Sequence, residues 1–126
     1  MRKTRIRVPK EIKIGAHSYE VLLDESQPDN GYNGTCVHER EEIWINPLSH
    51  KNSRRISLLH EVIHLVGRVF DLEPTESSVS RLAEGLGEFL YENLGIELDW
   101  SDIPSIKRIR EVKKESKKEI VGDSNA

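Results

Sequence analysis

Apolar residues in the first third of the chain come in short runs separated by turn residues. Residues 12–14 and 19–23 flank a Gly-Ala-His-Ser stretch, a pattern that predicts a β-hairpin. A turn-rich segment follows over residues 24–34. A second pair of strands is then expected over residues 35–38 and 42–46, because apolar and polar residues alternate there.

Two helical patterns occupy the middle of the chain. Apolar positions in residues 49–70 cover a wide arc at the helical period, so a long and largely buried helix is expected there. Pro74 interrupts this pattern, and residues 75–93 then repeat it with a single apolar stripe. Residues 96–104 are expected to form an extended segment.

These elements predict an α+β fold, in which a small antiparallel or mixed sheet of three to four strands packs on two main helices. The length of 126 residues fits one domain. We place a single domain at residues 1–104. Residues 105–126 are mostly charged and are expected to form a tail that is partly helical or disordered.

Composition narrows the class of protein. Charged residues make up 33% of the chain, and no apolar run is long enough to cross a bilayer. The basic start lacks the apolar core of a signal peptide. We therefore expect no membrane partner and a cytoplasmic location. The single cysteine, Cys36, excludes an intrachain disulfide and is expected to be buried or half-buried.

The net charge of −3 conceals basic ends. Residues 1–10 carry five basic and no acidic side chains, and residues 105–126 carry seven basic and four acidic ones. Short charged ends are usually solvated and mobile. No aromatic residue lies among these basic positions to stack on bases, so a nucleic-acid partner is not expected.

The strongest chemical signal is an H-E-x-x-H motif at residues 60–64, inside the first predicted helix. The spacing of four residues places His60 and His64 on one helix face, where both imidazoles can bind one Zn²⁺. Glu61 is rotated about 100° from the first histidine, so it can act as the general base without occupying a ligand position. The competing interpretation is two boundary histidines and a solvated glutamate.

A catalytic zinc site of this type needs a third protein ligand. No histidine or cysteine follows His64, so the ligand is either a downstream carboxylate or an upstream histidine. The nearby carboxylates are Glu73, Glu76, Glu84 and Glu88. Among them, Glu76 lies at the edge of the buried stripe of the second helix, and periodicity favours it. Its alternative role is an acid in the first helical turn, which favours the helix dipole.

Residues 43–93 resemble the ImmA/IrrE-like group of small zincin peptidases, especially the single-domain forms of phages and prophages. The matching segments are Glu42 to Pro47, the motif from Leu58 to His64, and the stretch from Glu76 to Ala83. The last stretch is similar to the family pattern E-x-x-A-x-x-F-A, with Val79 and Leu82 in place of alanine and phenylalanine. The resemblance implies that Glu76 is the third zinc ligand, and that peptides bind by adding a strand to a sheet edge.

The function expected from these residues is zinc-dependent hydrolysis of a peptide or protein substrate, such as a cytoplasmic regulator. Glu61 would take a proton from water and pass it to the leaving amine. The alternatives are a catalytically silent metal-binding or regulatory module and a nucleic-acid-associated protein. Residues 42–46 are expected to line the cleft, with Trp44 in its wall or packed on the sheet. His38 and Tyr91 are conceivable stabilisers of the oxyanion, and neither is assigned. The oligomeric state stays open.

Overall fold

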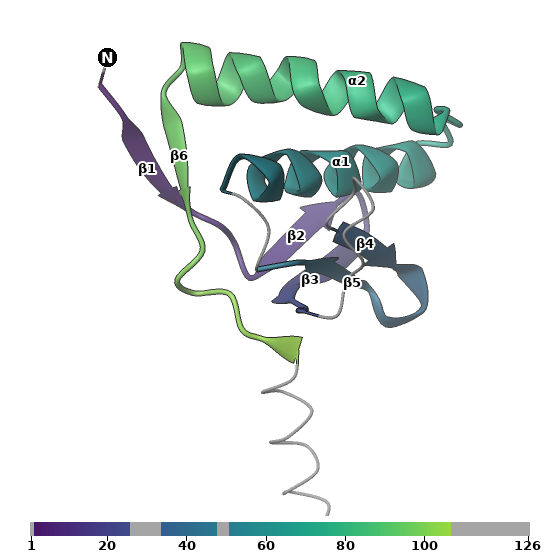
Figure 1. The fold of residues 1–126 in the computed structure, drawn as a ribbon. Coiled ribbons are helices and arrows are strands. Elements are labelled where there is room, and N and C mark those ends of the chain that lie inside the picture. The colour runs from purple at the N-terminus through teal and green to yellow at the C-terminus, as the bar shows by residue number, and fades with distance from the viewer. Residues whose placement is uncertain (1, 26–33, 48–50, 107–126) are drawn as a thin grey trace, which may run out of the picture.

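The computed structural model describes residues 2–25, 34–47 and 51–106, and it has the predicted α+β architecture (Figure 1). The strands are β1 (Thr4–Arg7), β2 (Glu11–Ile14), β3 (His17–Leu23), β4 (Gly34–Val37), β5 (Glu42–Ile45) and β6 (Ile96–Asp99). The helices are α1 (Lys51–Val69) and α2 (Glu76–Gly87), with a 3-10 turn at His38–Arg40 and a π-helical turn at Glu88–Asn93. Residues 26–33 of the turn-rich segment predicted over residues 24–34 lie outside the described residues.

The main sheet has the strand order β2-β3-β5-β4. The predicted hairpin is confirmed as the antiparallel pair β2–β3, and Gly15 takes a φ of +60° in its turn. The second predicted strand pair is confirmed as β4–β5, also antiparallel. The two pairs join through a parallel contact between β3 and β5, which leaves β4 as an edge strand of this sheet. The sheet is therefore mixed.

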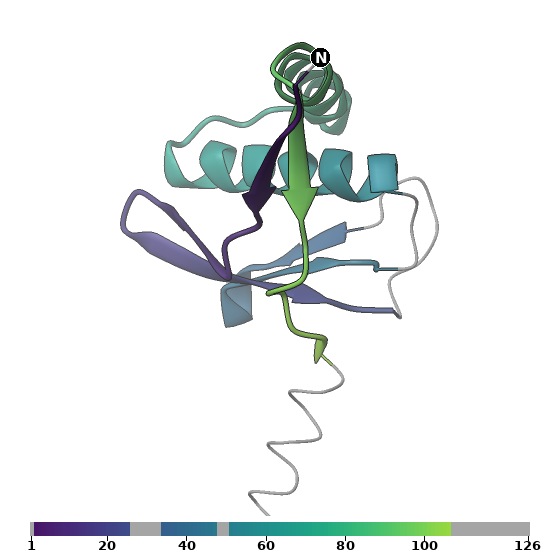
Figure 2. The same ribbon diagram turned by 90° about the vertical axis from the view of Figure 1, so that its left-hand side faces the viewer.

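The helices lie in two layers above this sheet (Figures 1 and 2). α1 covers the sheet, and α2 packs mainly on the other face of α1. The core between sheet and α1 contains Tyr19, Ile43, Ile45 and Leu65, all of them almost fully buried. Because α1 has neighbours on two sides, it needs the wide apolar arc that its sequence displays.

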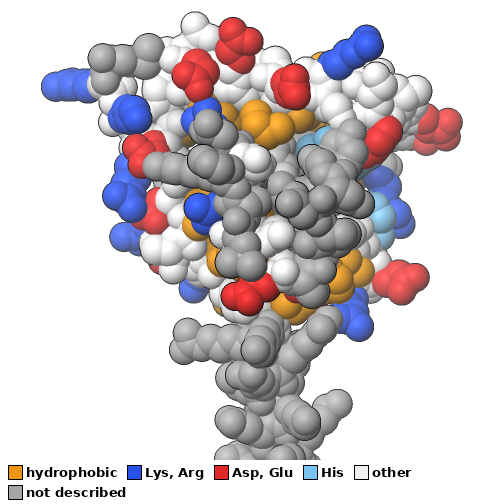
Figure 3. Space-filling view, viewed as in Figure 1, with side chains coloured by type: hydrophobic (Ala, Val, Ile, Leu, Met, Phe, Trp, Pro, Cys, Tyr) orange, Lys and Arg blue, Asp and Glu red, His pale blue; other side chains and the backbone are white. Residues whose placement is uncertain are grey.

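The basic start of the chain forms a strand, although all four of its residues are exposed, as its charge suggested. β1 pairs in parallel with β6, and the two strands run along one side of the layers (Figure 2). Arg5 forms an exposed ion pair of 3.3 Å with Asp99, and Val8 is buried immediately after the strand. The stretch Thr-Arg-Ile-Arg was not predicted as a strand, because its two arginines resemble a charged, solvated end of the chain. In Figure 3 basic side chains gather on the side that carries β1, and acidic ones lie over α2.

Packing contacts continue for two residues past the predicted domain boundary at residue 104. Ser105 forms a parallel bridge with Leu23, and Ile106 is buried. The remainder of the predicted tail, residues 107–126, lies outside the described residues. Within the part of the chain that the structure describes, neither helix combines the length and the apolar character that crossing a bilayer requires.

Candidate metal centre

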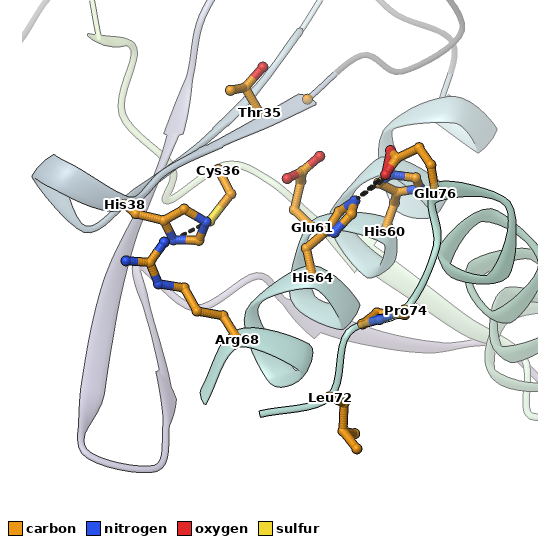
Figure 4. Close-up of a pocket in the computed structure, with 11 residues that line it drawn as sticks. Thr35, Cys36, His38, His60, Glu61, His64, Arg68, Leu72, Pro74 and Glu76 are labelled. Carbon is orange, nitrogen blue, oxygen red and sulfur yellow. Dashed lines mark hydrogen bonds and ion pairs between the residues drawn. The ribbon is translucent and has the colours of Figure 1, made fainter. Parts of the chain in front are cut away.

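The three predicted ligands meet in one cleft of about 530 Å³ (Figure 4). His60 and His64 project from one face of α1, one turn apart. Glu76 is the first residue of α2, and it is placed by the N-cap of that helix: the Thr75 hydroxyl accepts a hydrogen bond from the Ser78 amide. The turn between the helices thus brings a carboxylate back over the histidine pair.

The distances within this group are short and mutually consistent. The Nε2 atoms of His60 and His64 lie 3.2 Å apart. One oxygen of Glu76 lies 2.9 Å from His60 Nε2, and the other lies 2.8 Å from His64 Nε2. Ligand atoms around a tetrahedral zinc ion with bonds of about 2.0–2.1 Å stand roughly 3.3 Å apart. Two imidazoles and one carboxylate at these separations therefore fit a zinc ion, and one of its positions would stay open.

Glu61 lies beside this group and is only 6% exposed. Burial, followed by the negative charge of Glu76, raises the pKa of the Glu61 carboxyl to about 7. In Figure 4 its carboxylate points into the cleft, separate from the ligand atoms. No hydrogen-bond partner for it occurs among the described residues, so it is available to groups that enter the cleft. This is the position that the H-E-x-x-H spacing predicted for a general base.

The opposite wall of the cleft comes from β4 and the turn after it, and not from β5 as expected. Gly34, Thr35, Cys36 and His38 line this strand wall. Trp44 of β5 does not line the cleft; its indole nitrogen donates a hydrogen bond to Glu42 within the same strand. The two walls approach closely at Gly34, where an added Cβ would lie 3.4 Å from Cγ of Glu61.

His38 is held in place from behind by Tyr19. The Tyr19 hydroxyl lies 3.0 Å from His38 Nδ1, and the sulfur of Cys36 lies 3.7 Å from the same nitrogen. Burial raises the pKa of Tyr19 and raises that of Cys36 to about 12, so both groups keep their protons. The direction of these two contacts depends on which ring nitrogen of His38 carries the proton, because a hydroxyl and a thiol can each donate or accept. As predicted, Cys36 is half-buried.

Of the two side chains considered for the oxyanion, only His38 lines the cleft. Tyr91 is buried elsewhere, where its hydroxyl donates to the carbonyl of Arg55. Sequence reasoning missed Arg68, which lines the cleft at its far end. Its signal was available, since Arg68 follows His60 and His64 at further steps of four residues along the same helix face.

A comparison of the chain with protein-family models, curated protein sequences and solved structures found no match. Two imidazoles, one carboxylate that bridges them and one separate buried carboxylate are the side chains that metal-assisted hydrolysis requires.

Proposed function

We propose that this chain is a zinc-dependent peptidase in which His60, His64 and Glu76 hold the zinc ion. The observation that carries the proposal is the position of Glu76. Its two carboxylate oxygens lie within 2.9 Å of the two histidines, although it comes from a different helix. If the H-E-x-x-H sequence had arisen by chance, a carboxylate at metal-ligand distance from both histidines would not be expected.

The metal ligands and Glu61 have separate roles in the proposed reaction. When bound, zinc supplies Lewis-acid polarisation of a carbonyl and makes water more acidic. Glu61 accepts a proton from water in the cleft and later delivers it to the leaving amine nitrogen. Burial raises the pKa of Glu61 in the metal-free cleft, and a bound cation would act in the opposite direction by favouring the carboxylate form that accepts a proton.

The resemblance to ImmA/IrrE-like zincins supports the same assignment. It implies that a peptide binds as an added strand, and β4 is an edge strand that faces the ligand group. Backbone hydrogen bonds supply most of the affinity in that mode. A cytoplasmic regulatory protein, such as a repressor of a phage or mobile element, is the substrate that the resemblance favours.

The test begins with metal content. The full chain is purified without chelator as wild type, His60→Ala, Glu61→Gln and Glu76→Ala, with Glu84→Ala as a matched control on the exposed side of α2. We expect about one zinc per chain in wild type, Glu61→Gln and Glu84→Ala, because their three ligands are intact. His60→Ala and Glu76→Ala should lose the metal under the same conditions.

Activity is then measured on a peptide library with the zinc-loaded proteins. Wild type and Glu84→Ala should cleave, and Glu61→Gln should not, since it keeps the metal and lacks the base. Zinc binding without cleavage by any protein of the set would favour the silent metal-binding module. Absence of zinc uptake by the folded wild type would refute the proposal.

A further inference from the structure

The cleft contains a cation that neither metal binding nor proton transfer uses. Arg68 is the single lysine or arginine among the described residues that line the cleft, and it is exposed. It has no ion-pair or hydrogen-bond partner in the described part of the chain, whereas Arg5, Arg7 and Arg55 each pair with an acid. A guanidinium placed in a cleft without a carboxylate partner is a ready recognition group for one.

Arg68 lies next to the strand wall. Figure 4 shows its side chain extending from α1 toward His38. Burial lowers the pKa of the His38 imidazole, and the positive charge of Arg68 lowers it further. Burial also raises the pKa of Tyr19 and of Cys36, and the same charge of Arg68 opposes both shifts. These effects on three side chains place the guanidinium at the end of the cleft bounded by the strand wall.

His38 adds a second polar group at this end. Its Nδ1 lies 3.0 Å from the Tyr19 hydroxyl, and when that hydroxyl donates, the neutral ring carries its proton on Nε2. The far end of the cleft therefore presents a planar cationic fork beside an imidazole, and the fork can donate to a carboxylate that enters the cleft.

We propose that Arg68 and His38 form a subsite for a carboxylate of the peptide substrate, and the proposal rests on the peptidase function proposed above. The carboxylate is either an acidic side chain or the C-terminus of the substrate. Arg68 follows His64 by one further turn on the same face of α1, so the recognised carboxylate lies beside the ligand group and not on it.

Binding of three related kinds of peptide tests the subsite without any need for cleavage. The first is a set of alanine-based hexapeptides with both ends capped, each with one glutamate at a different position. The second has glutamine in place of glutamate, and the third is the glutamine peptide with a free C-terminal carboxylate. Their dissociation constants are measured with the full-length chain, once metal-free in chelator and once as zinc-loaded Glu61→Gln.

We expect one of the carboxylate peptides to bind about tenfold more tightly than the neutral peptide, as a charge-assisted hydrogen bond at an accessible site allows. A preference for the glutamate peptide assigns the subsite to an acidic side chain. A preference for the free C-terminus assigns it to the end of the substrate. Arg68→Gln should abolish the preference, and Arg68→Lys should retain part of it. Arg81→Gln removes an equal charge from the exposed face of α2 and should leave the preference intact.

Two results would overturn the subsite. One is an equal affinity of all three peptides for the wild-type chain. The other is a preference that survives Arg68→Gln and disappears in chelator, because the carboxylate would then bind the metal itself. The metal-free measurement also separates the two proposals. A chain that binds no zinc and still prefers the carboxylate peptide through Arg68 would refute the peptidase and keep the subsite.

Discussion

The two walls of the cleft are built in different ways. The helix wall carries His60, Glu61 and His64 on one continuous stretch of α1, and Glu76 follows after a short turn. The strand wall combines an edge strand with the turn after it, and its histidine is held by Tyr19 from another strand. At the base of the helix wall His60 and Glu61 are buried, while Glu76 at its rim is exposed, as is Thr35 of the strand wall.

This difference matches the work that each wall is proposed to do. Metal ligands must be held within a few tenths of an ångström, which requires side chains locked by packing and regular backbone. A surface that receives a peptide must instead offer accessible backbone groups, as an edge strand does. The helix wall lies over the core, and the strand wall lies at the rim of the sheet.

The largest loss of folding stability is expected when a buried side chain beneath the helix wall is removed. Leu65 is 0% exposed and lies in the core, next to His64 in the sequence of α1. Leu65→Ala should lower the free energy of unfolding by about 2–5 kcal/mol, because it leaves a cavity between α1 and the sheet. Urea denaturation monitored by circular dichroism measures this. Leu82→Ala, at a 51% exposed position of α2, is the control, and an equally large loss there would contradict this account.

A smaller effect is expected from the support of the strand wall. Tyr19→Phe removes the hydroxyl that lies 3.0 Å from His38 Nδ1, so stability should fall by about 0.5–1.5 kcal/mol. Zinc affinity should stay unchanged, because the hydroxyl does not contact the ligands. Denaturation and zinc titration of the same preparation measure both quantities. A loss of zinc binding in this variant would show that the two walls are coupled.

The smallest change in folding stability is expected from the protonation of His38 at low pH. Burial, together with the positive charges of Arg68 and His64, lowers the pKa of this imidazole in the folded state. As the pH falls through the unfolded value of about 6.5, the unfolded chain takes up the proton first, and stability is lost. Above that pH both states are neutral, so the group contributes no pH dependence.

The metal-free protein, kept in chelator, is the form in which to measure this pH dependence. Stability is compared at about pH 7.5 and about pH 6, on either side of the unfolded value, for wild type, His38→Gln and the control His17→Gln, which removes an exposed histidine. His38→Gln should lose less stability on acidification than wild type. Equal losses in wild type and His38→Gln would assign the pH dependence to other groups.

Much of the fold could be predicted because its signals are local. The hairpin, the second strand pair and both helices follow from periodicity and turn residues, and the structure confirms them within a few residues. β1 was missed because arginines at alternate positions look like a solvated tail. Its pairing partner β6 is about ninety residues away, and the residues near β1 in the sequence do not predict such a distant contact.

The sequence by itself determined the helix wall, because a helix converts fixed spacing into a fixed face. The spacing of His60, Glu61 and His64 was therefore enough to place them together, and periodicity selected Glu76 from four nearby carboxylates. Only the tertiary structure decided what faces them. Because β3 pairs with β5, β4 lies at the sheet edge, and His38 in the turn after β4 lies near Arg68. Strand order depends on contacts between distant segments, and spacing along the chain does not encode it.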